Sequence, residues 1–199
     1  MADPGVATRK TALRHSVLLA RRDLTEDERR AASRSAVERL VRLPEVWRSG
    51  VVALYVALDD ELDPSSAVPL LRERGIRTLF PRVRGEHLDL AEATDPHALP
   101  GGFRGIREPT GPAIDPDVVD VAVLPGVAYD LDGGRLGQGG GHYDRLLPQL
   151  PEDTVRVGLG FSCQVVPRVP REDHDEVVDI VVTDHAVHRT GARREPRDA

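Results

Sequence analysis

Cysteine, aromatic residues and lysine are all scarce in this sequence of 199 residues. Its one cysteine, Cys163, excludes an internal disulfide framework and favours a reducing compartment, so we expect the protein in the cytoplasm. Aromatic residues make up only 4% of the chain, so the core has to be built from Val, Leu, Ala and Ile. Lys10 is the only lysine among 27 basic residues, and this abundance of arginine is by itself no evidence of function.

Long hydrophobic runs and an excess of positive charge are also lacking. The longest unbroken apolar run, residues 51–58, is far shorter than the roughly 20 residues that a membrane-spanning helix needs. A second apolar run, residues 17–20, is too short for the core of a signal peptide and is followed by Arg21, Arg22 and Asp23. The net charge of −6 gives no general attraction to nucleic acid. We therefore expect neither a membrane nor a nucleic-acid partner.

Periodic patterns in the sequence predict alternating helices and strands. Helical spacing predicts a helix over residues 8–23 and a second one that starts with a capping box of Thr25 and Glu28 and runs to about Leu43. Further helices are expected to begin near Asp63 and Asp144. Apolar or alternating runs predict strands, which are residues 51–57, 77–81, 87–90, 118–124, 155–161 and 177–183.

This alternation of strands and helices predicts the fold class. Strands separated by helices favour an α/β domain, here a three-layer Rossmann-like fold with a mostly parallel sheet and helices on both faces. Hydrophobic residues make up 40% and charged residues 30% of the chain, which suits a globular domain with a real core. We expect residues 1–187 to form one domain and residues 188–199 to be a polar, disordered tail.

The segment most informative about function is rich in glycine. Six of the 18 glycines lie within residues 133–141, between a predicted buried strand and a predicted helix. Without Cβ atoms, successive N–H groups can turn toward an anion, and the start of the following helix also favours phosphate. Arg135 and Arg145 flank the glycines and can contact phosphate oxygens. The pattern therefore predicts an α/β domain that binds a phosphate or a nucleotide.

Two common nucleotide-binding motifs do not fit this segment. A Walker A loop would continue with Gly-Lys-Ser or Gly-Lys-Thr, which the sequence lacks. In a dinucleotide-binding fingerprint that starts at Gly137 and Gly139, the third glycine would fall at His142. A flexible turn without a ligand remains the alternative, and the residues alone lead no further than a phosphate site.

Five groups of residues form motifs that follow one another along the chain. They are Lys10-x-x-Leu13-Arg14, Tyr55-Val56 with Asp60-Glu61, Gly105-Ile106-Arg107-Glu108-Pro109, residues 125–130 with 135–144, and His174-Asp175 with Asp179. In this order the motifs resemble those of the 5-formyltetrahydrofolate cyclo-ligase family, also called methenyltetrahydrofolate synthetases. The resemblance extends over nearly the whole chain.

The resemblance implies an ATP-dependent ring closure. In that family, ATP and Mg²⁺ activate the formyl oxygen of 5-formyltetrahydrofolate by phosphoryl transfer. Attack by N10 then expels phosphate and leaves 5,10-methenyltetrahydrofolate and ADP. The implied small-molecule partners are thus ATP and 5-formyltetrahydrofolate, with Mg²⁺ as the metal, and we expect a monomer or a weak homodimer.

The resemblance also assigns roles to particular residues. Arg135 and Lys10 match catalytic positions. Val56 and Glu61 match positions that contact the folate, and Asp144 and Asp175 match positions that hold Mg²⁺. The residues that match nucleotide-binding positions are Lys10, Arg14, Arg135, Leu136, Gly137, Gln138, Gly139, Gly140, Gly141, His142 and Tyr143.

Two loop residues depart from the family's commonest pattern and leave other functions open. Many members have tyrosine in place of His142, and a basic or aromatic residue in place of Gln138. One alternative is a non-catalytic module that binds nucleotide or folate; another is an ATP-dependent ligase acting on a different formyl or amide compound. Retention of Asp144, Asp175, Arg135 and Lys10 counts against the pure binding module, which would need no metal ligands. Residues 84–118, rich in proline and glycine, are a candidate for a wall of the folate pocket.

Overall fold

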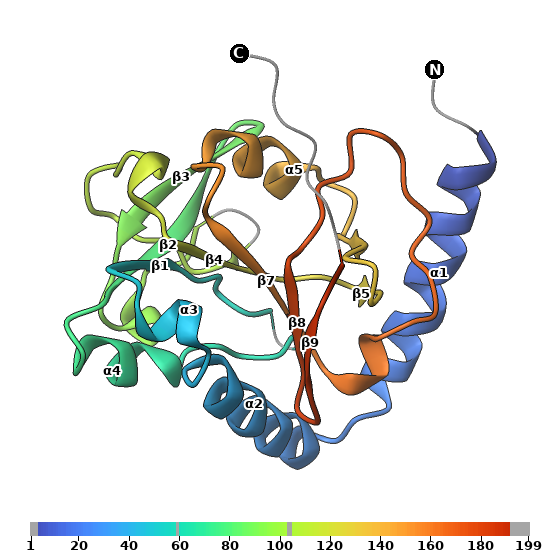
Figure 1. The fold of residues 1–199 in the computed structure, drawn as a ribbon, viewed down its shortest axis with the longest axis horizontal. Coiled ribbons are helices and arrows are strands. Elements are labelled where there is room, and N and C mark those ends of the chain that lie inside the picture. The colour runs from blue at the N-terminus through green and yellow to red at the C-terminus, as the bar shows by residue number, and fades with distance from the viewer. Residues whose placement is uncertain (1–3, 59, 103–104, 192–199) are drawn as a thin grey trace.

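A sheet of seven strands forms the centre of the molecule (Figure 1). The computed structural model describes residues 4–58, 60–102 and 105–191. The five inner strands pair in parallel and the two edge strands pair antiparallel with their neighbours, so the predicted α/β class is confirmed. From edge to edge the strands are β3 (His87–Glu92), β2 (Arg77–Arg84), β1 (Val51–Ala53), β4 (Val121–Leu124), β7 (Val155–Leu159), β8 (Ile180–Val182) and β9 (Val187–Arg189).

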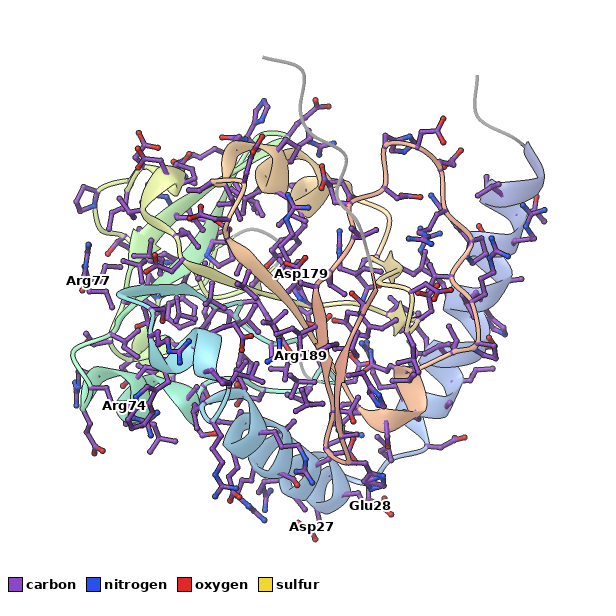
Figure 2. The ribbon with its side chains drawn as sticks, in the orientation of Figure 1. Asp27, Glu28, Arg74, Arg77, Asp179 and Arg189 are labelled. Carbon is purple, nitrogen blue, oxygen red and sulfur yellow. The ribbon has the colours of Figure 1, made fainter. Side chains whose placement is uncertain are left out.

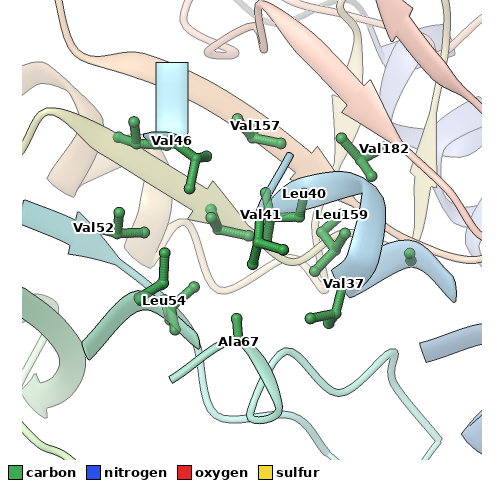
Figure 3. Close-up of a cluster of buried hydrophobic side chains, with 14 of the residues drawn as sticks. Val37, Leu40, Val41, Val46, Val52, Leu54, Ala67, Val157, Leu159 and Val182 are labelled. Carbon is green, nitrogen blue, oxygen red and sulfur yellow. The ribbon is translucent and has the colours of Figure 1, made fainter. Parts of the chain in front are cut away.

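Helices cover both faces of this sheet and give the three layers expected. Alternate residues of a strand point to opposite faces, and in β4 Val121 and Val123 belong to one core cluster while Ala122 and Leu124 belong to another. Figure 3 shows the first cluster, in which Val37 and Leu40 lie among side chains of the sheet. The first face is covered by α2 (Glu26–Leu40), α3 (Pro44–Trp47) and α4 (Ala67–Arg72), and the second by α5 (His142–Leu146) and the 3-10 turn η4 (Leu147–Gln149).

The N-terminal helix, α1 (Pro4–Arg22), packs beside a small second sheet (Figure 1). That sheet is the hairpin of β5 (Ala128–Tyr129) and β6 (Arg135–Leu136). Val17 of α1 is buried in a cluster with Val127, Ala128, Leu136 and Val169. The packing places one side of α1 against the segment that carries the glycines.

The predicted second helix begins as expected but ends earlier. The Thr25 hydroxyl accepts a hydrogen bond from the Glu28 N–H (3.3 Å) and the Glu28 carboxylate accepts one from the Thr25 N–H (2.8 Å), which completes the capping box. Asp27 and Glu28, in the first turn of α2, lie at the periphery of the molecule (Figure 2). The helix ends at Leu40 because Leu43, directly before Pro44, is extended, as proline requires of its neighbour.

Two further differences concern short strands. The β5–β6 hairpin separates β4 from α5, where the sequence indicated a direct passage from strand through glycine loop to helix. Two-residue strands are too short to show an alternating pattern. Strand β9 continues the sheet two residues beyond the predicted domain end at 187; residues 192–199 of the predicted tail lie outside the described residues. Short 3-10 turns complete the fold: η1 (Pro96–Ala98), η3 (Pro116–Val118) and η5 (Ser162–Gln164).

No helix in the described ranges combines the length and the apolar character that crossing a membrane requires.

Candidate active site

A cavity of about 650 Å³ opens at the carboxyl ends of two central parallel strands. Tyr55 and Val56 follow β1, and Pro125 and Gly126 follow β4; all four line this cavity. Ligands of open α/β sheets bind at this edge. The site residues singled out from the sequence all line it: Lys10, Arg14, Val56, Glu61, Arg135, Leu136, Gly137, Gln138, Gly139, Gly140, Gly141, His142, Tyr143, Asp144 and Asp175.

The glycine loop between β6 and α5 forms one wall of the cavity. Gly139 (φ +100°) and Gly141 (φ +67°) have left-handed backbone conformations that side chains disfavour. The Arg14 Nε donates a hydrogen bond to the Gly137 carbonyl (2.8 Å), and the Arg14 guanidinium lies 3.8 Å from the position where Gly139 would carry a Cβ. The loop therefore follows a path that needs glycine, and α1 holds it in place.

Arg135 is a buried cation at the base of this loop. Its side chain is 3% exposed, and its Nη2 pairs with the Asp144 Oδ1 (2.5 Å) in the first turn of α5. Its guanidinium carbon lies 5.8 Å from the centre of the Tyr143 ring. Its buried Nε has no hydrogen-bond partner among the described residues. Arg135 thus lines the cavity with an orientation fixed by Asp144.

Lys10, in α1, lies between two carboxylates. Its Nζ contacts the Asp175 Oδ2 (2.5 Å) and the Glu172 Oε2 (2.9 Å). Burial lowers the pKa of Lys10, but hydrogen bonds and charge from Asp175 and Glu172 outweigh burial and raise the pKa above its ordinary value of 10.5. Lys10 therefore stays charged at neutral pH and is held by ion pairs beside the glycine loop.

The carboxylates expected to hold Mg²⁺ both line the cavity. Asp144 pairs with Arg135, and Asp175 with Lys10, each through one oxygen. Within the described ranges no group of three or more His, Cys, Asp or Glu side chains is arranged to hold a metal ion. Mg²⁺ in phosphate sites is commonly bound by one or two carboxylates together with water and substrate phosphates. This donor set therefore fits an ion that arrives with a phosphorylated ligand.

Glu61 is a buried carboxylate in the cavity wall, next to Gln138 of the glycine loop. Its side chain is 9% exposed, and its Oε2 accepts a hydrogen bond from the Leu58 N–H (3.1 Å). Burial raises the pKa of Glu61; the Leu58 N–H, the charge of Arg21 and a hydrogen bond from Gln138 act in the opposite direction without cancelling it. Glu61 is thus a fixed acceptor facing a partly apolar space.

That space is lined by side chains that sequence reasoning did not single out, although it offered residues 84–118 as a candidate for a wall of the folate pocket. The stretch 84–118 contributes Leu88, Ile106 and Glu108 to the wall. Glu108 also accepts a hydrogen bond from the Val83 N–H (3.0 Å), which joins this stretch to β2. The motif of residues 105–109 contains Ile106 and Glu108, and it was the available signal for their position. The other side chains missed are Tyr55, Leu58, Pro81, Val83, Pro125 and His174.

Arg145 has a different place from the one its position beside the glycines indicated. It donates hydrogen bonds to the Gly140 carbonyl (2.8 Å) and to the Glu86 carbonyl (2.7 Å) in the turn between β2 and β3. It is not among the residues that line the cavity. Arg145 therefore joins the glycine loop to the β2–β3 turn, and the cavity-facing arginines are Arg14 and Arg135.

Comparison with known proteins shows extensive similarity. The model of the 5-formyltetrahydrofolate cyclo-ligase family matches residues 6–184. A 5-formyltetrahydrofolate cyclo-ligase of Escherichia coli K12 is 32% identical over 171 residues, which cover 82% of this chain and 93% of its own. The mouse protein of the same name is 26% identical over 196 residues, covering 92% and 97%. The solved structure of Aquifex aeolicus 5,10-methenyltetrahydrofolate synthetase has a TM-score of 0.79 at 38% identity, covering 95% of this chain and 96% of that one.

Proposed function

The chain belongs to the 5-formyltetrahydrofolate cyclo-ligase family, and we propose that it uses ATP and Mg²⁺ to convert 5-formyltetrahydrofolate to 5,10-methenyltetrahydrofolate, ADP and phosphate. The observation that carries this proposal is that one cavity gathers the glycine loop, the cations Lys10, Arg14 and Arg135, and the buried carboxylate of Glu61. Such a reaction requires two reactants held together and charge neutralised on the moving phosphoryl group. The cavity has groups for both tasks.

The glycine-loop side of the cavity binds the nucleotide in this proposal. Residues 136–143 surround the phosphates with backbone N–H groups, and Lys10, Arg14 and Arg135 supply positive charge. The burial of the Arg135 side chain supports its role, because a cation interacts more strongly with phosphate where water is excluded.

The chemistry consists of two displacements. The formyl oxygen attacks the terminal phosphorus of ATP, and the bond from that phosphorus to ADP breaks. N10 then attacks the formyl carbon and loses its proton, while the bond from carbon to the phosphate oxygen breaks and phosphate leaves. Arg135 and Lys10 stabilise the negative charge on the phosphoryl oxygens during the first displacement. They do so at little reorganisation cost, because ion pairs already hold both side chains.

Asp144 and Asp175 would hold Mg²⁺ on this side of the cavity. The ion, when bound, supplies charge neutralisation and orients the phosphate chain. Each carboxylate also has a task of its own in the chain, since Asp144 fixes the direction of Arg135 and Asp175 that of Lys10. Both carboxylates would therefore act on the phosphates in two ways, by orienting a cationic side chain and by holding the metal ion.

The part of the cavity lined by Glu61 and the apolar side chains binds the folate in this proposal. Val56 and the apolar side chains of Val83, Leu88 and Ile106 offer contact surface for a ring system. Glu61 supplies a fixed acceptor for N–H donors of the tetrahydropterin ring. In this proposal the formyl group lies between these folate-binding residues and the glycine loop.

We also place the working protein in the cytoplasm, as a monomer or a weak homodimer. The single cysteine, Cys163, is free, which suits a reducing compartment.

The experiment that tests the proposed function is a cyclisation assay with omissions. Purified protein is mixed with 5-formyltetrahydrofolate, ATP and Mg²⁺, and methenyltetrahydrofolate is followed by its absorbance while ADP is quantified. We expect product only when all three components are present, with one ADP formed per product. Binding of ATP by folded protein without product would support a non-catalytic module instead. ATP hydrolysis that depends on another formyl or amide compound, and not on the folate, would support a different ligase.

A further inference from the structure

A buried arginine lies directly behind Glu61. The side chain of Arg21, in the last turn of α1, is only 2% exposed. Its Nε and Nη2 donate hydrogen bonds to the Asp60 Oδ2 (3.2 and 2.8 Å). Its Nη1 is buried without a hydrogen-bond partner in the described part of the chain, and lies 3.9 Å from the Glu61 Oε1. A buried guanidinium is expensive to desolvate, so its place next to the site carboxylate calls for a reason.

The geometry of α1 explains how the arginine reaches this position. Lys10, Arg14 and Arg21 are separated by four and seven residues, a spacing that puts them on one side of a helix. Lys10 and Arg14 line the nucleotide side of the cavity, whereas Arg21 is not among the lining residues. Asp60 anchors two of its nitrogens, which leaves Nη1 directed at Glu61. Arg21 can thus act on a ligand only through Glu61.

We propose that Arg21 is a positioning residue that holds the Glu61 carboxylate charged and oriented toward the folate. This inference rests on the proposed function, in which Glu61 accepts hydrogen bonds from the folate ring. The Leu58 N–H fixes one oxygen of Glu61, and Arg21 attracts the other. Asp60 orients Arg21 in turn. Contacts among these three side chains thus connect the folate-binding part of the cavity to α1.

The charges around Glu61 show why a cation is needed there. Burial and the negative charge of Asp60 both favour the neutral form of Glu61. The hydroxyls of Tyr55, Tyr129 and Tyr143 also lie close enough to interact with its charge. Arg21, with hydrogen bonds from Leu58 and Gln138, favours the ionised form. Without Arg21, Glu61 would take up a proton at higher pH and lose part of its strength as an acceptor.

The first test compares substitutions of Arg21 with one of its neighbour. We expect Arg21→Gln to raise the KM for 5-formyltetrahydrofolate by roughly tenfold or more, with the KM for ATP changed less than about twofold. Arg21→Lys should restore part of the folate affinity. The acid limb of kcat/KM for the folate should move to higher pH in Arg21→Gln. Arg22→Gln is the matched control, because Arg22 is exposed at the same helix end, and it should change neither KM.

The second test is a double-mutant cycle with Glu61. If Arg21 acts through Glu61, then Arg21→Gln should change folate binding by less than about twofold in a Glu61→Gln background. The proposal would be overturned if the two substitutions weakened folate binding by factors that multiply in the double variant. An equal rise in the KM values for ATP and the folate in Arg21→Gln would also overturn it. Either result would leave Arg21 a structural residue. If Arg21→Gln does not fold, Arg21→Lys enters the same cycle, and the same outcomes decide.

Calorimetric binding of 5-formyltetrahydrofolate separates this inference from the proposed function. Wild-type protein that does not bind the folate would contradict the proposed function itself. If wild-type protein binds the folate, but the Arg21 and Glu61 substitutions weaken this binding by factors that multiply, only the role of Arg21 is contradicted. We expect wild-type binding and a cycle in which the effect of Arg21 disappears once Glu61 is replaced.

Discussion

Two of the cationic side chains of the cavity are held by carboxylates before a ligand binds. Arg135 pairs with Asp144, and Lys10 with Asp175. Such pairs fix the directions of long side chains, so less conformational entropy is lost when phosphate binds. Replacing one of these carboxylates should disturb both the direction of its cation and the binding of Mg²⁺, whereas replacing the cation removes the positive charge alone.

Replacing Arg135 tests the cation closest to the proposed phosphoryl transfer. Arg135→Ala should lower kcat by roughly 10²–10³-fold, as the loss of one charge-stabilising donor does in other enzymes. Steady-state kinetics with ATP and the folate would measure this effect. Arg42→Ala, at a side chain 76% exposed on the surface, is the control and should leave kcat unchanged. Unchanged turnover in Arg135→Ala would remove Arg135 from the site.

Replacing Asp144 tests the expected metal ligand. Asp144→Asn should raise the Mg²⁺ concentration needed for half-maximal activity by roughly tenfold, a change typical of altered metal sites. A Mg²⁺ titration at saturating ATP and folate measures it. Asp132→Asn, at an exposed position in the β5–β6 turn, is the matched control. Identical Mg²⁺ titrations of Asp144→Asn and wild type would exclude Asp144 as a ligand.

The pH dependence of folate use should report on Glu61. Burial raises the pKa of Glu61 above its ordinary value of 4.5. Because the ionised form accepts hydrogen bonds, and this form is lost as pH falls through the raised pKa, kcat/KM for the folate should decline on the acid side above pH 4.5. Glu61→Gln should lower kcat/KM and abolish this limb. An unchanged acid limb in Glu61→Gln would show that another group titrates.

Prediction of single site residues from the sequence depended on whether they stood in a recognisable motif. Lys10, Arg14, Arg135 and the glycine loop stood in such motifs, and the structure brings them to one cavity. Arg21 had no such signal, because its partners Asp60 and Glu61 lie about 40 residues away and pairing of this kind depends on the tertiary fold.

At the scale of elements, local signals predicted long segments better than short ones. The capping box at Thr25 and the apolar runs of β4 and β7 are confirmed because each carries its own pattern. The β5–β6 hairpin has no periodic signal. Its turn is held by the buried Asp130, whose carboxylate accepts hydrogen bonds from the N–H groups of Asp132, Gly134 and Val169. The last of these is 39 residues away, so the sequence alone did not reveal it.

The start of α2 offers a test of local stability separate from activity. Thr25→Ala removes the hydroxyl that accepts the Glu28 N–H, and should lower the free energy of unfolding by about 1 kcal/mol. Urea denaturation measures the loss, and kcat should stay unchanged because this helix end lies outside the cavity lining. Thr25→Ser retains the cap and is the control. Equal stability of Thr25→Ala and wild type would show that the cap contributes nothing.

At the scale of the whole molecule, the fold brings distant segments to one edge of the sheet. The parallel strands β1 and β4 are neighbours, so the segments that follow them open onto the same space. Helix α1 closes this space from one side, and the stretch 84–118 from the other. The alternation of strands and helices predicted the class of fold. The positions of α1 and of residues 84–118 around the cavity depend on long-range packing, which periodic patterns do not reveal. His142 and Gln138, which differ from the residues that most family members have at these positions, both line the cavity.

The most direct test of the whole account follows the formyl oxygen. We would supply 5-formyltetrahydrofolate with ¹⁸O in its formyl group, together with ATP and Mg²⁺, and analyse the released phosphate by mass spectrometry. The account predicts that each molecule of methenyltetrahydrofolate formed is matched by one phosphate carrying the label. Unlabelled phosphate, with the label in water or formate, would contradict phosphorylation of the formyl oxygen in this cavity.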